Sequence, residues 1–422
     1  MGIFTKLKCK KLMKEQKFGE VVKLCNLTEF TIPDGVTSIY GFRNCSSLKF
    51  VNIPSSVTSI DSAAFSGCSS LTSIIIPDGV TSIPQYAFSE CSSLKEVKIP
   101  KSVTSIGARA FENCKNLKSI EILNGVTSIE RWAFSGCTSL ENLVIPDSVT
   151  EIGSMAFSGC TSLKNLVIGN GITSINKEFH GCRNLEHVVI GNGVKSLGKL
   201  FAYCENLTSV IIPNSVTEIG SFAFRECEKL ESITIPNSVI SIGSCAFARC
   251  NRLKSVIFEK NSQLISIDDE AFRWCSNLTN ITIPDGVRSI GEKAFQGCPL
   301  TNIVLPDGLT TIGKGAFENC DLLTSITIPD SVTCIDECAF WGCNNLRSII
   351  IPNGVTNIGA SAFEDCNKLQ NITFKKTDTW FRVFNRDDWI GKKSGKKTDV
   401  TNSSTNAMNF KSVYYDDYWF RL

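Results

Sequence analysis

Histidine is almost absent from this chain of 422 residues, which contains only His180 and His187. Zinc sites and acid–base catalysis near neutral pH commonly depend on histidine. The sequence also lacks a C-x-x-C pair, a G-x-S-x-G or H-E-x-x-H motif and a glycine-rich phosphate loop. These absences argue against the common hydrolases, metalloproteases and nucleotide-binding enzymes. We expect no metal and no cofactor.

Long apolar runs and a strongly basic surface are missing as well. No segment is long enough to span a membrane, and residues 1–24 contain no apolar stretch typical of a secretory signal. The formal net charge is only +2, with seven Lys against two Glu in residues 1–24 and ten Lys or Arg against six Asp in residues 375–422, which leaves the middle near −7. Such a body does not suit phosphate neutralisation, so we predict no nucleic acid partner.

One short motif is abundant instead. The stretch AFSGCSSL (64–71) returns as AFSECSSL (87–94), AFENCKNL (110–117) and AFSGCTSL (133–140 and 156–163). Its cysteine recurs at a spacing of 23 residues at most steps, and Cys25 opens a shortened copy at the front. The recurring cysteines are Cys45, Cys68, Cys91, Cys114, Cys137, Cys160, Cys182, Cys204, Cys227, Cys250, Cys275, Cys298, Cys320, Cys343 and Cys366. A fixed period of this length indicates a solenoid of stacked turns.

One copy, LTSIIIPDGVTSIPQYAFSEC (71–91), can be interpreted position by position. Ile74 and Ile76 point to one side of an extended segment, which predicts a short strand that ends at Pro77. Asp78 and Gly79 provide a turn. The other inward positions are Val80, Ile83, Ala87, Phe88 and Cys91, the last three in a short helical or 3₁₀ turn. A single copy buries too little apolar surface to fold alone, so many must stack.

The pattern resembles the leucine-rich repeats, and specifically the cysteine-bearing BspA-like subclass, whose repeat appears here as LTSIIIPDGVTSIPQYAFSEC and LLTSITIPDSVTCIDECAFWGC (322–343). We therefore predict a β-rich solenoid: a right-handed leucine-rich repeat rod of about 16 rungs, with a parallel β-sheet and short 3₁₀, helical or extended segments on the other side. Residues 1–24 are expected to form a basic helical cap, with a weak membrane-surface helix as the alternative. Residues 25–374 are expected to form the solenoid, and 375–422 an aromatic-rich C-terminal cap.

The resemblance also has implications for function. Members of this family are known mainly as surface proteins of bacteria and some protists, and several look like adhesins for host matrix proteins. It implies a non-enzymatic, surface or secreted scaffold that binds a protein ligand, with proteins of the host extracellular matrix as candidates. We expect a monomer. A cytoplasmic location is the alternative, because twenty cysteines without a signal peptide are compatible with a reducing compartment.

The recurring cysteines admit three interpretations: a disulfide ladder, metal ligands or small apolar core residues. Side chains of a stacked ladder point in parallel rather than at one another, and free Cys is among the most buried residue types. We favour buried free thiols. Cys334 and Cys338 are the one close pair, and bridging or metal ligation there is the alternative.

Outward positions on the strands of leucine-rich repeat folds usually contact partners. Apolar residues occupy one such position on four consecutive turns, which predicts an extended docking surface. Exposed β-branched residues also suit strands without any function, and this alternative stays open. The predicted partner-binding face comprises Ile75, Asn142, Val144, Asn165, Val167, His187, Val189, Ser209, Ile211 and Ile257.

The repeat is interrupted at three places. GNG replaces Pro-Asp-Gly at 169–171 and 191–193, and a two-residue insertion in FEKNSQLISID (258–268) is expected to bulge a turn. The tail from residue 375 drops the repeat. Its Trp380, Trp389 and Trp419 are expected either to cover the last turn or to form a carbohydrate or protein contact site. In the second case the solenoid would be a structural spacer that presents the tail.

An enzyme is the rival class. Neighbouring acids occur at Asp268–Glu270, at Asp387 with Asp388 and at Asp416 with Asp417, and glycoside hydrolysis needs only two carboxyl groups. Adjacent acids usually lie on a solvated turn, however, and nothing in the sequence marks a pocket around them. We predict that the protein is not an enzyme.

Overall fold

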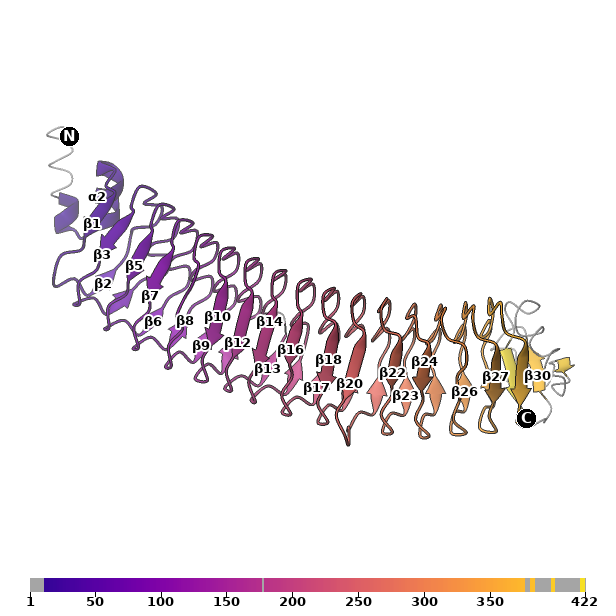
Figure 1. Ribbon diagram of the computed structural model, residues 1–422. Helices are drawn as coiled ribbons and strands as arrows, with labels where there is room; N and C mark the ends of the chain where they lie inside the picture. The colour runs from indigo at the N-terminus through magenta and orange to yellow at the C-terminus, as the bar shows by residue number, and fades with distance from the viewer. Residues whose placement is uncertain (1–10, 177, 376–379, 384–395, 399–417, 422) are drawn as a thin grey trace. The chain divides into compact units, whose positions relative to one another are not determined.

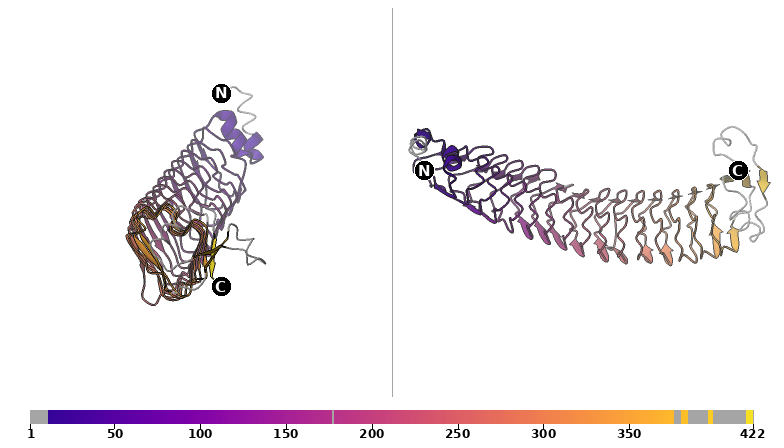
Figure 2. Two further views of the ribbon diagram at one scale, coloured as in Figure 1. Left: turned by 90° about the vertical axis from the view of Figure 1, so that its right-hand side faces the viewer. Right: turned by 90° about the horizontal axis from the view of Figure 1, so that it is seen from above.

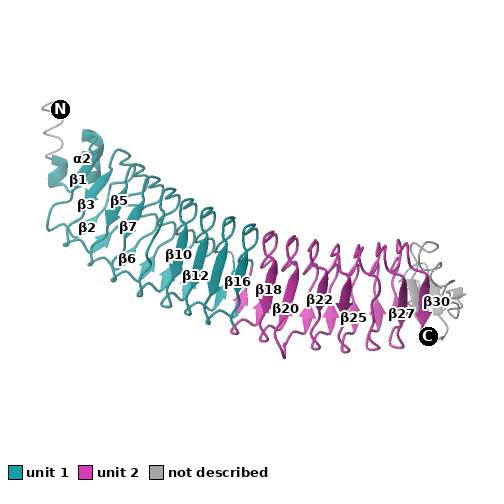
Figure 3. Cartoon of the chain, in the orientation of Figure 1, with its two compact units in different colours: residues 1–195, 199–213 teal, residues 196–198, 214–422 magenta. Residues whose placement is uncertain are grey.

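A computed structural model describes residues 11–176 and 178–375, together with the backbone of 380–383, 396–398 and 418–421. The chain forms two compact units: unit 1 contains residues 1–195 and 199–213, and unit 2 contains 196–198 and 214–422 (Figure 3). Within each unit, successive turns stack on one another as a parallel β-solenoid (Figures 1 and 2). The predicted fold class is confirmed, with about 15 turns rather than 16. Cys25 is the last residue of helix α2 (Phe18–Cys25) and lies in no strand.

The first side of each turn, the strand-lined face, carries strands of three or four residues where the repeat is regular. In unit 1 they are β1 (Glu29–Thr31), β3 (Phe50–Asn52), β5 (Ser73–Ile75), β7 (Glu96–Lys98), β10 (Asn142–Ile145), β12 (Asn165–Ile168), β14 (His187–Ile190) and β16 (Ser209–Ile211). In unit 2 they are β18 (Ser232–Ile235), β20 (Ser255–Phe258), β22 (Asn280–Thr282), β24 (Asn302–Val304), β27 (Ser348–Ile351) and β29 (Asn371–Phe374).

This face is a series of short parallel ladders and not the continuous sheet that the repeat predicts. In unit 1 the ladders are β1-β3, β5-β7 and β10-β12-β14-β16, and in unit 2 they are β18-β20, β22-β24 and β27-β29. The equivalent segment at Ser119–Glu121 forms no strand, and the segment around Thr327 makes only a single bridge to Ile350. Pairing therefore opens at defined turns, which becomes important for the cavities described below.

A second ladder of two-residue strands lies on another side of the turns. The sequence predicts inward-pointing apolar residues there but no strands. In unit 1 its strands are β2 (Ser38–Ile39), β4 (Ser59–Ile60), β6 (Ser82–Ile83), β8 (Ser105–Ile106), β9 (Ser128–Ile129), β11 (Glu151–Ile152) and β13 (Ser174–Ile175). In unit 2 they are β15 (Ser196–Leu197), β17 (Glu218–Ile219), β19 (Ser241–Ile242), β21 (Ser266–Ile267), β23 (Ser289–Ile290), β25 (Thr311–Ile312), β26 (Cys334–Ile335) and β28 (Asn357–Ile358). From β15 to β28 the pairing is unbroken.

The third side consists of tight turns, where a short helical or 3₁₀ turn was expected. Two residues in a typical turn adopt the left-handed conformation, as Tyr86 (φ 57°) and Glu90 (φ 61°) do on either side of Phe88. Residues other than glycine enter this region at a cost of roughly 1 kcal/mol. The turns are nevertheless held in place, because main-chain groups bond to the next turn: the Phe65 N–H donates to the Ala87 carbonyl at 2.9 Å.

The core of each unit is built from columns of identical side chains. The phenylalanine column stacks ring on ring, with centroids 5.1 Å apart between Phe134 and Phe157 and an interplanar angle of 3°. The column runs from Phe42 to Phe179 in unit 1 and from Phe224 to Phe363 in unit 2. These rings are almost fully shielded from solvent. Each apolar layer is covered by its neighbours, as stacking requires.

The cysteine column lies beside the rings as buried free thiols, as favoured from the sequence. The thiols also act as donors: Cys91 Sγ donates to the Phe65 carbonyl of the preceding turn at 3.2 Å, and Cys114 Sγ donates to that of Phe88 at 3.2 Å. The Phe65 carbonyl also accepts the N–H of Cys68 at 3.1 Å. Each such cysteine therefore links two turns through its thiol. The interpretation of cysteine as a small apolar core residue does not predict this hydrogen bond.

At the N-terminal end of unit 1, α2 places Phe18 against Phe30 and Phe42, with ring centroids 5.7 Å and 6.5 Å apart. At the C-terminal end of unit 2, β32 (Tyr418–Arg421) pairs antiparallel with β28 and with β30 (Trp380–Val383), which also pairs with β31 (Lys396–Thr398). Trp389 and the side chains of Trp380 and Trp419 lie outside the described residues. The predicted domain boundaries and the tail contact site stay predictions.

Candidate functional site

The four-stranded ladder β10-β12-β14-β16 of unit 1 brings eight of the predicted face residues together. In-register pairing aligns Asn142, Asn165, His187 and Ser209, which we call the polar row. It likewise aligns Val144, Val167, Val189 and Ile211, the apolar row. Both rows point outward, because the residues between them, such as Leu143 and Leu166, are buried. The site thus has two causes. Side chains alternate between the two faces along each strand, and the strands pair so that equivalent residues lie side by side.

The apolar row leaves branched side chains in contact with water. Their exposed fractions are 58% for Val144, 39% for Val167, 45% for Val189 and 65% for Ile211. Neighbouring strands are about 4.8 Å apart, so the four side chains form one strip on the order of 15 Å long. A contiguous exposed apolar strip on a soluble protein surface is a feature of binding sites.

The polar row is partly satisfied by its own members. The Asn165 side-chain amide donates to Oδ1 of Asn142 at 2.7 Å, and His187 Nδ1 lies 3.0 Å from Ser209 Oγ. Among the described residues, no carboxylate lies within hydrogen-bond distance of His187. This serine–histidine pair therefore lacks the third group that orients the base in a catalytic triad. The row frames the apolar strip and shows no catalytic arrangement.

Ile75 and Ile257 do not join this strip. Ile75 lies on β5, and the charged Lys98 and Glu121 occupy the same outward position on the next two turns of unit 1. Ile257, 52% exposed, lies on β20 of unit 2 and pairs with Thr234. The predicted face thus contains one compact group of eight residues and two separate positions.

A cavity of about 570 Å³ opens at the β10 end of the strip in unit 1. It lies between the strandless segment around Glu121 and β10, and shares Asn142 and Val144 with the two rows. The repeat pattern does not predict this cavity. A departure at the same turn was visible, because Leu123 stands where neighbouring turns have proline. The cavity is lined by Ser119, Ile120, Glu121, Ile122, Leu123, Asn124, Asn142, Val144 and Pro146.

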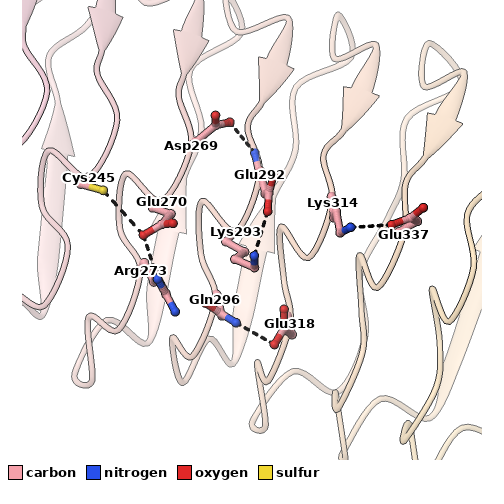
Figure 4. Close-up of polar contacts among 10 residues, drawn as sticks. All are labelled: Cys245, Asp269, Glu270, Arg273, Glu292, Lys293, Gln296, Lys314, Glu318 and Glu337. Carbon is pink, nitrogen blue, oxygen red and sulfur yellow. Dashed lines mark hydrogen bonds and ion pairs between the residues drawn. The ribbon is translucent and has the colours of Figure 1, made fainter.

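The tight-turn side of unit 2 carries a second concentration of polar groups (Figure 4). Arg273 Nη1 lies 2.9 Å from Glu270 Oε2, which also accepts from Cys245 Sγ at 3.6 Å. Burial raises the pKa of Glu270, but the hydrogen bond and charge of Arg273 outweigh it and hold that pKa below its usual value. Burial and the Glu270 carboxylate raise the pKa of Cys245, which disfavours a reactive thiolate.

Further along the same side, acids and bases pair with each other. Lys293 Nζ lies 2.8 Å from Glu292 Oε1, Lys314 Nζ lies 2.6 Å from Glu337 Oε2, and the Gln296 amide donates to Glu318 at 2.6 Å. Figure 4 shows that the Lys314–Glu337 and Gln296–Glu318 contacts link neighbouring turns, whereas Lys293 and Glu292 are adjacent within one turn. The two lysine–glutamate ion pairs are partly exposed and of modest energy. This group is a structural network, with no converging unpaired acids of the kind glycoside hydrolysis uses.

Neither a metal site nor a membrane span emerges from the part of the chain that the structure describes. Among residues 11–176 and 178–375, no three His, Cys, Asp or Glu side chains gather as metal ligands. Within the same described part, none of the helices has the length and apolarity that crossing a bilayer would require. The close pair Cys334 and Cys338 are both half-buried, and burial raises the pKa of Cys338.

Solved structures of bacterial leucine-rich repeat proteins are similar to this chain. A structure of a leucine-rich repeat protein from Bacteroides ovatus is 32% identical, over 82% of this chain and 87% of that protein, with a TM-score of 0.65. A leucine-rich cell surface protein from Faecalibacterium prausnitzii is 27% identical, over 86% of this chain and 90% of that one, with a TM-score of 0.38. No curated protein matches.

The chain matches a family model described as a BspA type leucine rich repeat region of six copies. The matched segments are residues 20–140, 92–200, 176–267, 198–320 and 265–382, which overlap along the whole solenoid. The resemblance inferred from the cysteine-bearing motif is confirmed. This chain belongs to the BspA-type leucine-rich repeat family.

Proposed function

We propose that the protein is an adhesin-like scaffold at the cell surface that captures a host or matrix protein through the strand-lined face of unit 1. The observation that carries this proposal is the apolar row, four exposed branched side chains on four hydrogen-bonded neighbouring strands. Leucine-rich repeat proteins of this family are typically protein-interaction scaffolds. The surface location rests on family membership alone.

The arrangement suits a partner with a flat or extended contact region. The cavity beside β10 provides a recess at one end of the row, and the polar row provides amide, hydroxyl and imidazole groups along one edge. Interfaces commonly combine such an apolar centre with a polar rim. We propose that the protein binds as a monomer, since the two rows by themselves form a surface that needs no second copy.

The test is to place charge in the middle of the row. The double variant Val167→Asp with Val189→Asp is expected to abolish capture of immobilised matrix proteins such as fibronectin, laminin and collagen, measured by surface plasmon resonance. Both side chains are exposed, so the melting temperature should change little. The matched control is Thr150→Asp with Thr173→Asp, which puts two charges at exposed positions off the strand-lined face of the same unit.

Two outcomes decide against the proposal. If the row variant binds every captured matrix protein as well as the wild type does, the row is not the contact site. If instead a chain that ends at Lys375 loses binding while the row variant keeps it, the tail is the binding element and the solenoid is a spacer. Melting must be followed in the shortened chain, because β32 pairs with β28 at the end of unit 2.

A further inference from the structure

The turn that carries the insertion in FEKNSQLISID (258–268) forms one wall of a cavity. This cavity, of about 580 Å³, lies wholly within unit 2 on the strand-lined face. One wall is formed by β20 and the inserted turn, with Ile257, Glu259 and Asn261; the other is formed by β22 and the turn that follows it, with Thr282 and Asp285. Its volume lies within the range of sites that bind small ligands or short peptide segments.

The strands on either side of this cavity are not paired with each other. β20 pairs with β18, and β22 pairs with β24, but among the described strands no ladder joins β20 to β22. Two strand edges with main-chain N–H and C=O groups therefore face the cavity. Main-chain groups that have no ladder partner here can bond a ligand that offers both donors and acceptors, as an extended peptide segment does.

The charge of the lining is entirely negative. Glu259 and Asp285 both line the cavity, and none of its lining residues is Lys, Arg or His. One carboxylate oxygen of Glu259 accepts the Asn237 N–H at 3.1 Å, which leaves the other oxygen available. Arg288 bonds the main-chain oxygen of Asp285 at 2.9 Å, and no ion pair joins its guanidinium to that carboxylate. Two positive charges therefore lie beside the lining without being part of it: the Arg288 guanidinium, next to the main chain of Asp285, and the exposed Lys260, which follows Glu259 in the chain.

Apolar surface accompanies these acids. Ile257 is exposed, and Phe258 is half-buried at the cavity wall. Lysine and arginine combine an aliphatic stem with a cationic head, so one side chain can cover Ile257 and reach a carboxylate. A bare metal cation or a small amine would leave the apolar part uncovered. A glycan is less suited, because no fully exposed aromatic ring lines the cavity as a stacking platform.

We propose that this cavity binds one lysine or arginine side chain of an extended segment of the protein partner, whose backbone lies along the β20 and β22 edges. The proposal rests on the proposed function in one respect: it takes the strand-lined face as the binding face. It does not depend on the apolar row, which lies in unit 1.

The test uses blocked pentapeptides and the full-length protein, so no natural partner is needed. Ac-AAKAA-NH₂ and Ac-AARAA-NH₂ are titrated against protein labelled at isoleucine methyl groups, and Ile257 is assigned by an Ile257→Val variant. The Ile257 methyl signal is expected to shift with saturation in the millimolar range. Ac-AAEAA-NH₂ and Ac-AALAA-NH₂ should leave it unchanged. Raising the salt from 50 to 500 mM should weaken the binding, because the pairs are solvent-accessible.

The double variant Glu259→Gln with Asp285→Asn removes both charges and keeps the shape of the side chains. It is expected to lower the affinity for the lysine peptide by about 5- to 20-fold, because two partly exposed ion pairs are lost. The matched control is Asp307→Asn, at the equivalent position of the next turn and outside the cavity lining. The control should bind like the wild type.

Three results would overturn the proposal: no shift of Ile257 at 20 mM lysine peptide, equal shifts with the glutamate peptide, or unchanged affinity in the double variant. A shift caused by a neutral oligosaccharide such as maltotriose, without one from the peptides, would assign the cavity to glycans instead. Failure here leaves capture through the apolar row intact. Conversely, loss of the row as a contact site would not affect the peptide titration.

Discussion

The phenylalanine column predicts how strongly neighbouring turns depend on each other. Phe157 is fully buried and stacks on Phe134 and Phe179 with centroid distances of 5.1 Å on both sides and interplanar angles of 3° and 2°. Phe157→Leu keeps an apolar side chain but removes both ring contacts. Each aromatic pair is worth about 0.5 to 1.5 kcal/mol beyond its buried area, and the smaller side chain adds a cavity cost of about 1 kcal/mol.

The expected loss is therefore about 2 to 4 kcal/mol in the free energy of unfolding. Urea denaturation followed by circular dichroism measures it. Because turns contact only their neighbours, hydrogen exchange should increase most in the turns directly before and after Phe157. The control is Phe50→Leu on β3, where the ring is 47% exposed and the cost should stay below about 1 kcal/mol.

Two results would refute this reasoning. One is a cost for Phe157→Leu no greater than that for Phe50→Leu, which would mean that ring stacking contributes little. The other is a uniform increase of hydrogen exchange throughout unit 1, which would mean that the unit unfolds as one body and that nearest-neighbour coupling does not describe it.

Three further predictions concern single positions. Burial raises the pKa of Cys137 to about 12, so a thiol reagent at pH 8 should leave this residue unmodified until the protein is unfolded; peptide mass spectrometry that finds it modified in the folded protein would contradict this. Glu178 occupies a slot where other turns have alanine, is 7% exposed, and has its pKa raised by burial. Its native form therefore binds a proton more tightly than the unfolded chain does, so Glu178→Gln should stabilise by about 1 kcal/mol at pH 7 and lose this advantage as the pH falls toward 4 in urea denaturation. Arg249 is exposed in the left-handed conformation (φ 61°), where equivalent turns have Gly297 and Gly342, and Arg249→Gly should raise the unfolding free energy by about 0.5 to 1 kcal/mol; a decrease would show that its side chain has a stabilising contact.

The interior of a turn could be predicted from the sequence because every copy repeats the same inward pattern. Ile74, Ile76, Phe88 and Cys91 are all buried as the spacing of apolar residues indicated. The second ladder could not be predicted, because strands of two residues are too short to show alternation. The role of the thiol as a donor was also inaccessible, since it depends on the position of a carbonyl in the preceding turn.

The candidate site was predictable in composition and less so in extent. The alternation of inward and outward side chains predicts that Val144, Val167, Val189 and Ile211 point outward, and the structure places them on one ladder. Whether neighbouring strands pair depends on the rise and path of the intervening loops, which no single copy specifies. The gaps beside Glu121 and after β20, and therefore both cavities, follow from those loops and were not foreseen.

The thiol column has a consequence for the environments that this protein tolerates. A disulfide forms through a thiolate that can reach another sulfur or a small oxidant, and shielding from solvent leaves residues such as Cys68 and Cys160 protonated and out of reach. The buried thiols of this solenoid can therefore stay reduced outside a cell as well as inside. For the recurring cysteines, abundance therefore reflects the packing of a repeated tight turn and is no guide to the redox compartment.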